Sequence, residues 1–206
     1  MEKPILFSGE MVRAILAGRK TQTRRVIKPQ PSAGVRRSVF VPSGLEDGHG
    51  RELRCPYGRP GDTLWVRETW ASHKYMDDTK PSEFTVGAQM LPVWYRADNA
   101  QSDERGKWRP SIFMPRWASR ITLLVTNVRV ERVRDISHSD ALAEGIEKAN
   151  LYSAMWKHCE YAGAYCFGTS DPRESFAKLW DSINAKRGYA WSDNPWVWVV
   201  EFEVVS

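Results

Sequence analysis

Cysteine is scarce in this sequence of 206 residues, which holds three, at positions 55, 159 and 166. An odd, irregularly spaced set excludes the disulfide framework that stabilises many small secreted domains. Paired C-x-x-C motifs are also lacking, and these are the strongest sequence signal for a structural zinc site. A weaker zinc site from His158, Cys159 and Cys166 stays open as an alternative, without an obvious fourth ligand. The cysteine usage favours a reducing, cytoplasmic setting with unpaired thiols.

Long apolar runs are missing as well. No segment approaches the about 18–20 apolar residues that a membrane-spanning helix needs, and the opening Met1-Glu2-Lys3-Pro4 lacks the apolar stretch of a signal peptide. We therefore expect no membrane partner. The sequence also has no P-loop, no dinucleotide-binding glycine motif, no HExxH and no GxSxG. Its length and ordinary hydrophobic content, 42%, are those of one domain spanning residues 1–206.

Two features stand out among the residues that are present. The sequence has 30 basic and 25 acidic residues, a net charge of +5, which permits nucleic-acid binding without requiring it. It also has ten tryptophans, whose flat rings serve either as buried core or as platforms on which bases stack.

A basic loop follows Gly18, a residue type that favours the end of a helix. Positions 19–25, Arg-Lys-Thr-Gln-Thr-Arg-Arg, hold four cations and two hydroxyls with no carboxylate. A helix C-terminus stabilises nearby cations by about 0.3–1 kcal/mol each, which explains one or two of them. The loop is therefore either a solvated cluster of charges or an anion-facing, catalytic loop in which Lys20 and Thr23 act together.

Hydrophobic periodicity predicts an α+β fold: a small mixed β-barrel of about six strands with two or three short helices. The expected strands are at 4–7, 25–27, 63–68, 92–97, 121–133 and 196–204. The expected helices are at 10–17, 137–144 and 172–187. Irregular insertions are expected near 28–54, 70–90 and 147–169, the first with at most one strand, at 38–41.

Glu144 occupies an unusual position in this scheme. Ser137 and Asp140 are spaced as a capping box that begins a short helix, and Gly145 ends that helix. An anion at a helix C-terminus is unfavourable, so Glu144 there indicates a functional role or a basic partner.

Arginine and tryptophan alternate in the segment 108–120. Arg109, Arg116 and Arg120 interleave with Trp108 and Trp117, a pattern that suits phosphates and bases together. The same pattern is typical of arginines that stack on tryptophans at a packed surface.

The run from Ile15 to Arg25 resembles the signature loop of the ASCH-domain family, a Gly-x-Lys-Thr-x-Thr-x-Arg pattern after a first helix. Two later pieces also fit in the right order: Gly61-Asp62-x-Leu64-x-Val66-Arg67-Glu68 and Asp140-Ala141-x-Ala143-Glu144-Gly145. The sequence further resembles the longer ASCH proteins of phages and prophages, which would place it in a bacterial host cytoplasm. The resemblance implies a PUA-like barrel and RNA or modified-nucleoside partners.

The resemblance also implies an activity. Small bacterial members with a similar loop are N4-acetylcytidine amidohydrolases that use a lysine, a threonine and a glutamate without metal or cofactor. Carried over by motif position, the catalytic residues are Lys20, Thr23 and Glu144. The residues expected to bind substrate are Arg19, Arg24, Arg25, Arg67, Glu68 and Trp117. Two other functions stay open: a non-catalytic module that binds RNA or other single-stranded nucleic acid, and a metal-dependent ribonuclease. The oligomeric state is not predicted.

Overall fold

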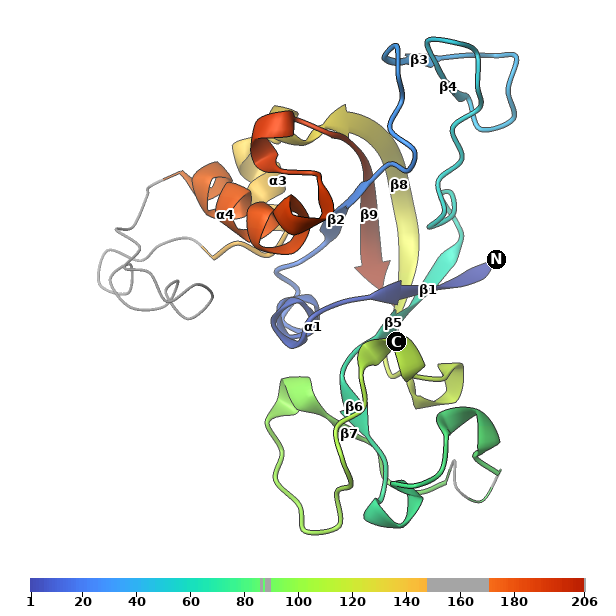
Figure 1. Ribbon diagram of the computed structural model, residues 1–206, viewed down its shortest axis with the longest axis vertical. Helices are drawn as coiled ribbons and strands as arrows, with labels where there is room; N and C mark the ends of the chain where they lie inside the picture. Colours follow the sequence, from blue (N-terminus) through green and yellow to red (C-terminus); the bar gives the residue numbers. More distant parts are fainter. Residues whose placement is uncertain (86, 88–89, 148–170, 206) are drawn as a thin grey trace. The chain divides into compact units, whose positions relative to one another are not determined.

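The computed structural model describes residues 1–85, 87, 90–147 and 171–205 (Figure 1). Its main sheet has five strands in the order β1-β5-β8-β9-β2, with β1 parallel to β5 and the β5–β8 and β9–β2 pairs antiparallel. The strands are β1 (Glu2–Leu6), β2 (Gln22–Val26), β5 (Thr63–Arg67), β8 (Thr122–Arg132) and β9 (Trp196–Val204). The predicted α+β class with a mixed sheet is confirmed; within the described residues the sheet has two edge strands, β1 and β2.

The chain forms two compact units, each assembled from segments that are distant in the sequence. The first unit is drawn from residues 1–18, 57–127 and 202–205, and the second from 19–56, 128–147 and 171–201. Short 3-10 helices occur in both: η1 (Lys74–Met76), η2 (Pro81–Glu83), η3 (Arg96–Asp98), η4 (Ser111–Phe113), η5 (Arg116–Ala118), η6 (Val133–Asp135), η7 (Ala185–Arg187) and η8 (Trp191–Asp193).

The first unit begins with β1 and helix α1 (Gly9–Leu16). The Ser8 hydroxyl caps α1 by accepting a bond from the Met11 amide, and Gly18 follows the helix at φ 68°. The short strands β6 (Trp70–Ala71) and β7 (Trp94–Tyr95) pair antiparallel. Trp70, at the start of the segment expected to be a polar insertion, is fully buried at the centre of a small core with Phe84, Met114 and Ala118. The strand expected at 92–97 is shorter than predicted.

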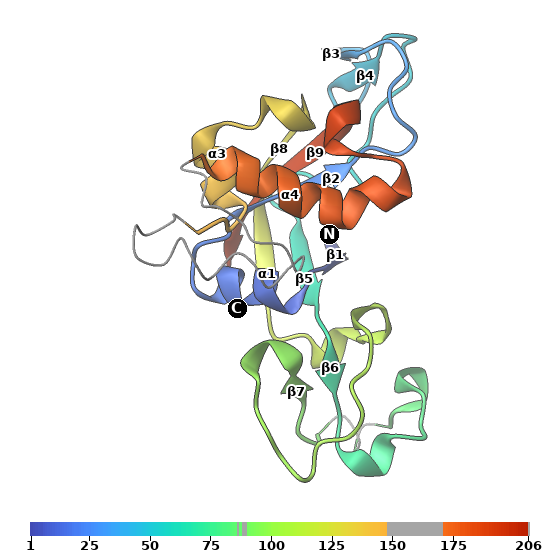
Figure 2. The ribbon, with the colours of Figure 1, turned by 60° about the vertical axis from the view of Figure 1, so that its left-hand side comes forward.

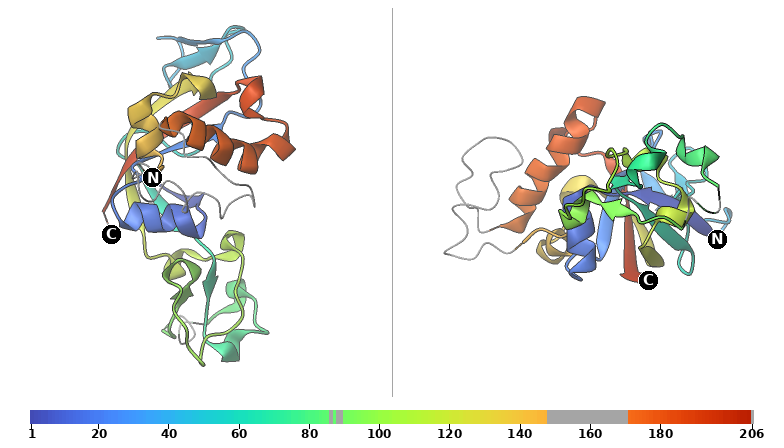
Figure 3. Two further views of the ribbon diagram at one scale, coloured as in Figure 1. Left: turned by 90° about the vertical axis from the view of Figure 1, so that its left-hand side faces the viewer. Right: turned by 90° about the horizontal axis from the view of Figure 1, so that it is seen from below.

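The second unit packs helices α3 (His138–Ala143) and α4 (Pro172–Asn184) onto β2 and β9 (Figure 2). The register pairs Arg24 with Val199 and Val26 with Val197, so these side chains share the face that the helices cover. The core on this face consists of Val133, Ile136, Ala141, Phe176, Trp180, Val197 and Val199. Figure 3 shows α4 from two further directions. The predicted helix start at Pro172 is confirmed, with Asp171 as its cap.

The first expected insertion has more regular structure than predicted. Residues 28–54 contain two strands, β3 (Val35–Arg37) and β4 (Leu45–Asp47), which form a hairpin. The strand expected at 38–41 is wrong: Val39 and Phe40 are 94% and 90% exposed, because the bonds from the Ser38 amide to the Gly44 carbonyl and from the Gly44 amide to the Val41 carbonyl close a turn there. The insertion expected at 147–169, with its candidate zinc ligands, lies outside the described residues apart from Glu147.

None of the helices in the described part of the chain is long and apolar enough to span a membrane.

Candidate active site

Lys20 and Glu144 form a buried ion pair in the second unit. The Lys20 ammonium lies 2.7 Å from Glu144 Oε2 and donates a second bond, 2.8 Å, to the Glu144 carbonyl oxygen. The two side chains are 1% and 5% exposed. The backbone fixes this contact as well, because residues 20 and 144 form a β-bridge and the Thr21 amide donates to the Ala143 carbonyl at 2.9 Å.

Helix α3 places Glu144 by local rules. The predicted capping box is confirmed: the Ser137 hydroxyl accepts from the Asp140 amide, and the Asp140 carboxylate accepts from the Ser137 amide. Glu144 is the C-cap, and Gly145 follows at φ 93°. The Lys20 ammonium is the basic partner predicted for Glu144, because a carboxylate at a helix C-terminus is unfavourable without a nearby cation.

The environment of Lys20 lowers the pKa of its side chain. Burial lowers the pKa of the ammonium; the Glu144 carboxylate opposes this effect, while the nearby charges of Arg25 and Arg24 lower the pKa further. A lysine of lowered pKa gives up its proton more readily at neutral pH, as a general base must.

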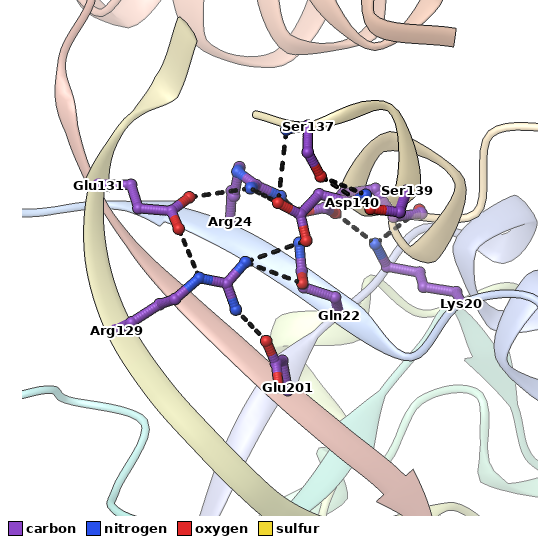
Figure 4. A network of polar contacts seen from close by, with 10 residues as sticks. Lys20, Gln22, Arg24, Arg129, Glu131, Ser137, Ser139, Asp140 and Glu201 are labelled. Atoms are coloured by element: carbon purple, nitrogen blue, oxygen red, sulfur yellow. Dashed lines mark hydrogen bonds and ion pairs between the residues drawn. The ribbon is translucent and has the colours of Figure 1, made fainter. Parts of the chain in front are cut away.

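Arg24 extends this pair into a larger network of charges (Figure 4). Its Nη1 lies 3.5 Å from Glu144 Oε1, and its Nη2 contacts Glu131 Oε2 at 3.0 Å and Asp140 Oδ2 at 3.1 Å. The guanidinium of Arg129 contacts the other oxygens of the same two carboxylates, Glu131 Oε1 and, at 3.0 Å, Asp140 Oδ1. Arg24, Asp140, Arg129 and Glu131 thus form a closed ring of alternating charge, which we call the charge ring.

Two further side chains border the charge ring. Arg129 also pairs with Glu201 of β9, and the Gln22 carboxamide lies beside Arg129 and Asp140. The ring therefore joins β2, β8 and α3, and Glu201 extends the network to β9.

Asp140 makes the charge ring sensitive to acid. Burial alone would raise the pKa of its carboxyl, but Arg24, Ser137 and Arg129 together hold that pKa below its ordinary value of 3.8. Stability from this group is therefore fully present above about pH 4 and is lost as the pH falls through the lower pKa of the folded state. We expect Asp140→Asn to flatten the acid limb of stability against pH, measured by urea unfolding between about pH 6 and pH 3. The exposed Asp103→Asn is the control, and equal slopes for Asp140→Asn and wild type would contradict the expectation.

Thr23 and Arg25 lie on the other face of β2. Gln22 and Arg24 both face Asp140, and side chains of a strand alternate, so Thr23 and Arg25 between and beyond them point the opposite way. Thr23 is buried there, opposite Val200 in the register. The structure thus brings together Lys20 and Glu144 and sets the Thr23 hydroxyl on the reverse side of the strand.

The two other expected substrate-binding residues of the second unit, Arg19 and Arg24, differ in their exposure to solvent. Arg19 is exposed and pairs with Glu147 at 3.0 Å, so it is available at the surface. The Arg24 side chain is 0% exposed.

Arg67, Glu68 and Trp117 belong to the first unit. Glu68 is buried against Arg120, at 3.0 Å; burial raises the pKa of its carboxyl, and the Arg120 guanidinium opposes that effect. Arg67 stacks over the Trp65 ring at 4.6 Å. Trp117 packs edge-on against Trp70, with 5.8 Å between the ring centroids.

The arginines of the segment 108–120 have partners within the first unit. Arg109 donates to the Met76 carbonyl, Arg116 pairs with Glu2 at 2.8 Å, and Arg120 pairs with Asp98 at 2.7 Å. Phosphates bound here would have to compete with these contacts.

Sequence reasoning missed Arg129, Glu131 and Glu201 as members of the site. The signal was present in the alternation of Val128, Arg129, Val130 and Glu131, which predicts a strand with one charged face. What that face meets depends on which strands and helices pack beside it.

Among the described residues, no group of three or more His, Cys, Asp or Glu side chains is arranged to hold a metal ion.

Comparisons with known proteins give similarity at low identity. No family model matches the sequence, and no curated protein matches it. The structure is similar to that of protein EF3133 from Enterococcus faecalis V583, of the family DUF984, with 12% identity, a TM-score of 0.43, and coverage of 100% of this chain and 80% of that one. It is also similar to an ASCH domain from Lactobacillus crispatus JV V101, with 11% identity, a TM-score of 0.40, and coverage of 99% and 79%. In the order of its loop motifs, the sequence resembles the ASCH-domain family.

Proposed function

We propose that this protein is a metal-independent amidohydrolase that removes the acyl group from an N4-acylated cytidine nucleoside or nucleotide. The observation that carries the proposal is the buried pair of Lys20, in the loop that resembles the ASCH signature, and Glu144, at the end of α3. A buried lysine of lowered pKa next to a carboxylate has the properties of an acid–base pair.

The proposed reaction consumes one water and conserves protons. The neutral amine of Lys20 takes the proton of the attacking hydroxyl as its oxygen bonds to the acyl carbon. The bond from that carbon to N4 then breaks, and N4 receives a proton from the Lys20 ammonium, which Glu144 holds in place. When water attacks, the products are cytidine and the carboxylic acid. When the Thr23 hydroxyl attacks, the acyl group is left as an ester on its oxygen, and a water molecule then hydrolyses this ester, its proton passing through Lys20 to the departing Thr23 oxygen. In both cases the carboxylic acid gives its proton to solvent and leaves as the carboxylate.

Thr23 is the proposed nucleophile by motif position. Its side chain, however, lies on the face of β2 opposite to Arg24 and Glu144, so an attack by water is the competing case. If its hydroxyl attacks the acyl carbon, Thr23→Ala abolishes hydrolysis and Thr23→Ser retains part of it. If a water molecule attacks instead, Thr23→Ala retains most of the activity. Single-turnover kinetics of wild type, Thr23→Ala and Thr23→Ser distinguishes attack by threonine from attack by water. Mass spectrometry of the wild-type reaction then tests for a peptide acylated at Thr23.

The decisive experiment incubates the purified protein with a panel of acylated nucleosides, nucleotides and short RNAs. Mass spectrometry should detect cytidine, or its nucleotide, released from the N4-acetylated form in the presence of a chelator. Failure of the whole panel would overturn the proposal. RNA cleavage that stops with chelator would indicate the metal-dependent ribonuclease. Binding of single-stranded RNA without turnover, with a log–log salt slope of about −0.7 per phosphate contact, would indicate the binding module.

A further inference from the structure

Arg24 and Lys20 are both buried cations of the basic loop, whereas Arg19 is exposed. The side chain of Arg24 is 0% exposed and lies 5.9 Å from the Phe176 ring, with the carboxylates of Glu131 and Asp140 on its Nη2. A guanidinium so enclosed has no face to offer a nucleotide, although it carries a full charge close to Lys20.

The charge ring fixes where that charge sits. Each carboxylate of the ring gives one oxygen to Arg24 and the other to Arg129, so neither arginine can turn without breaking contacts on both sides. Arg24 is thereby held with Nη1 3.5 Å from Glu144 Oε1, at the long limit of a hydrogen bond. A guanidinium without these contacts could donate hydrogen bonds to both oxygens of the Glu144 carboxylate and so compete with Lys20 for Oε2.

We propose that Arg24, anchored by the charge ring, is a positioning residue that holds Glu144 Oε1 so that Oε2 stays on the Lys20 ammonium. This inference rests on the proposed function, because it assigns Arg24 a role in the acid–base pair of that reaction. It replaces the substrate contact expected for Arg24 from the sequence.

The charges around Lys20 determine the sign of the expected effect. Among the described residues, the charges that act on the pKa of Lys20 are those of Glu144 at the end of α3 and of Arg24 and Arg25 of β2. Removing the positive charge of Arg24 makes protonation of Lys20 more favourable and leaves Glu144 to attract the ammonium more strongly. Lys20 then becomes a free base only at higher pH.

The test compares Arg24→Gln, Arg24→Lys and Arg129→Gln with wild type. Arg132→Gln is the matched control, since Arg132 is another cation of β8 whose contacts are the Asn194 carbonyl and the Trp196 ring, outside the charge ring. We expect Arg24→Gln to lower kcat at neutral pH by about tenfold to 100-fold, with KM unchanged. The rise of kcat with pH should move to higher pH, with a smaller move in the same direction for Arg129→Gln and none for Arg132→Gln.

Arg24→Lys restores a charge but cannot bridge two carboxylates as a fork, so it should move the pH profile back only in part. A rise in KM at constant kcat would overturn the proposal by showing that Arg24 binds substrate. A fall in kcat with an unmoved pH profile would overturn it by showing a merely structural role. If Arg24→Gln does not fold, Arg129→Gln, at a side chain that is 27% exposed, carries the same comparison.

A second readout does not depend on activity. The Nζ of Lys20 is titrated by NMR in protein labelled with 15N-lysine, and the signal is assigned through Lys20→Met. The titration should move to higher pH in Arg24→Gln and stay in place in Arg132→Gln. Absence of turnover in wild type would then count against the proposed function alone, whereas an unmoved Lys20 titration would overturn the positioning role.

Discussion

Lys20→Met is expected to lower the hydrolysis of N4-acetylcytidine by about 10²–10⁴-fold, the usual contribution of a general acid–base group. In the proposed reaction the amine of Lys20 takes and returns the proton, and burial lowers its pKa toward that role. The measurement is the initial rate of cytidine release, with protein concentrations matched by the folded fraction.

The control separates chemistry from folding. Lys20→Met leaves the Glu144 carboxylate buried with Arg24 at 3.5 Å, and breaking a buried pair in this way costs about 3–5 kcal/mol of unfolding free energy. The double variant Lys20→Met/Glu144→Gln removes both charges and should recover part of that loss while remaining inactive. A double variant that hydrolyses the substrate at the wild-type rate would show that the pair only fastens the basic loop to α3.

Trp180→Ala is expected to lower the free energy of unfolding by about 3–5 kcal/mol, as deletion of a large core side chain does. Trp180 is buried in the core of the second unit, packs on Phe176 at 6.2 Å, and donates its indole N–H to the Tyr189 carbonyl at 2.9 Å. Because Phe176 in turn lies beside the Arg24 guanidinium, the cavity would form close to the charge ring.

Urea unfolding followed by circular dichroism measures this loss. Trp180→Phe keeps most of the packing but leaves the Tyr189 carbonyl without its donor, so it should cost less, about 1–3 kcal/mol. Lys178→Ala, at an exposed position of the same helix, should stay within about 0.5 kcal/mol of wild type. A Trp180→Ala protein as stable as Lys178→Ala would show that α4 does not depend on this contact.

Local signals in the sequence were sufficient for much of the fold. The Ser137–Asp140 capping box, the proline at the start of α4 and the strand at 196–204 are each predicted from neighbours within a few residues, and all three are confirmed. The hairpin of β3 and β4 shows the limit of such signals. Apolar Val39 and Phe40 predicted a strand, but the turn around Gly44 decides the structure there.

The site itself depends on contacts that no local pattern contains. The unfavourable place of Glu144 at a helix end correctly indicated a basic partner, and the ASCH-like loop directed attention to Lys20. The alternation of β2 was readable, but whether Thr23 or Arg24 faces Glu144 depends on which side α3 docks. The charge ring needs β2, β8 and α3 side by side, and this arrangement follows from tertiary packing.

The pairing of β2 with β9 also constrains when the site can form during synthesis. Lys20 and Glu144 are 124 positions apart, and the strand that pairs with β2 ends at Val204. A ribosome adds about 5–20 residues per second, so β2 waits on the order of ten seconds for its partner. During that interval β2 is an unpaired strand edge, and its Arg24 and Arg25, like Arg19 and Lys20 before it, carry charges that discourage pairing with other chains. The cations that we assign to chemistry in the finished protein would thus also protect the nascent chain from aggregation.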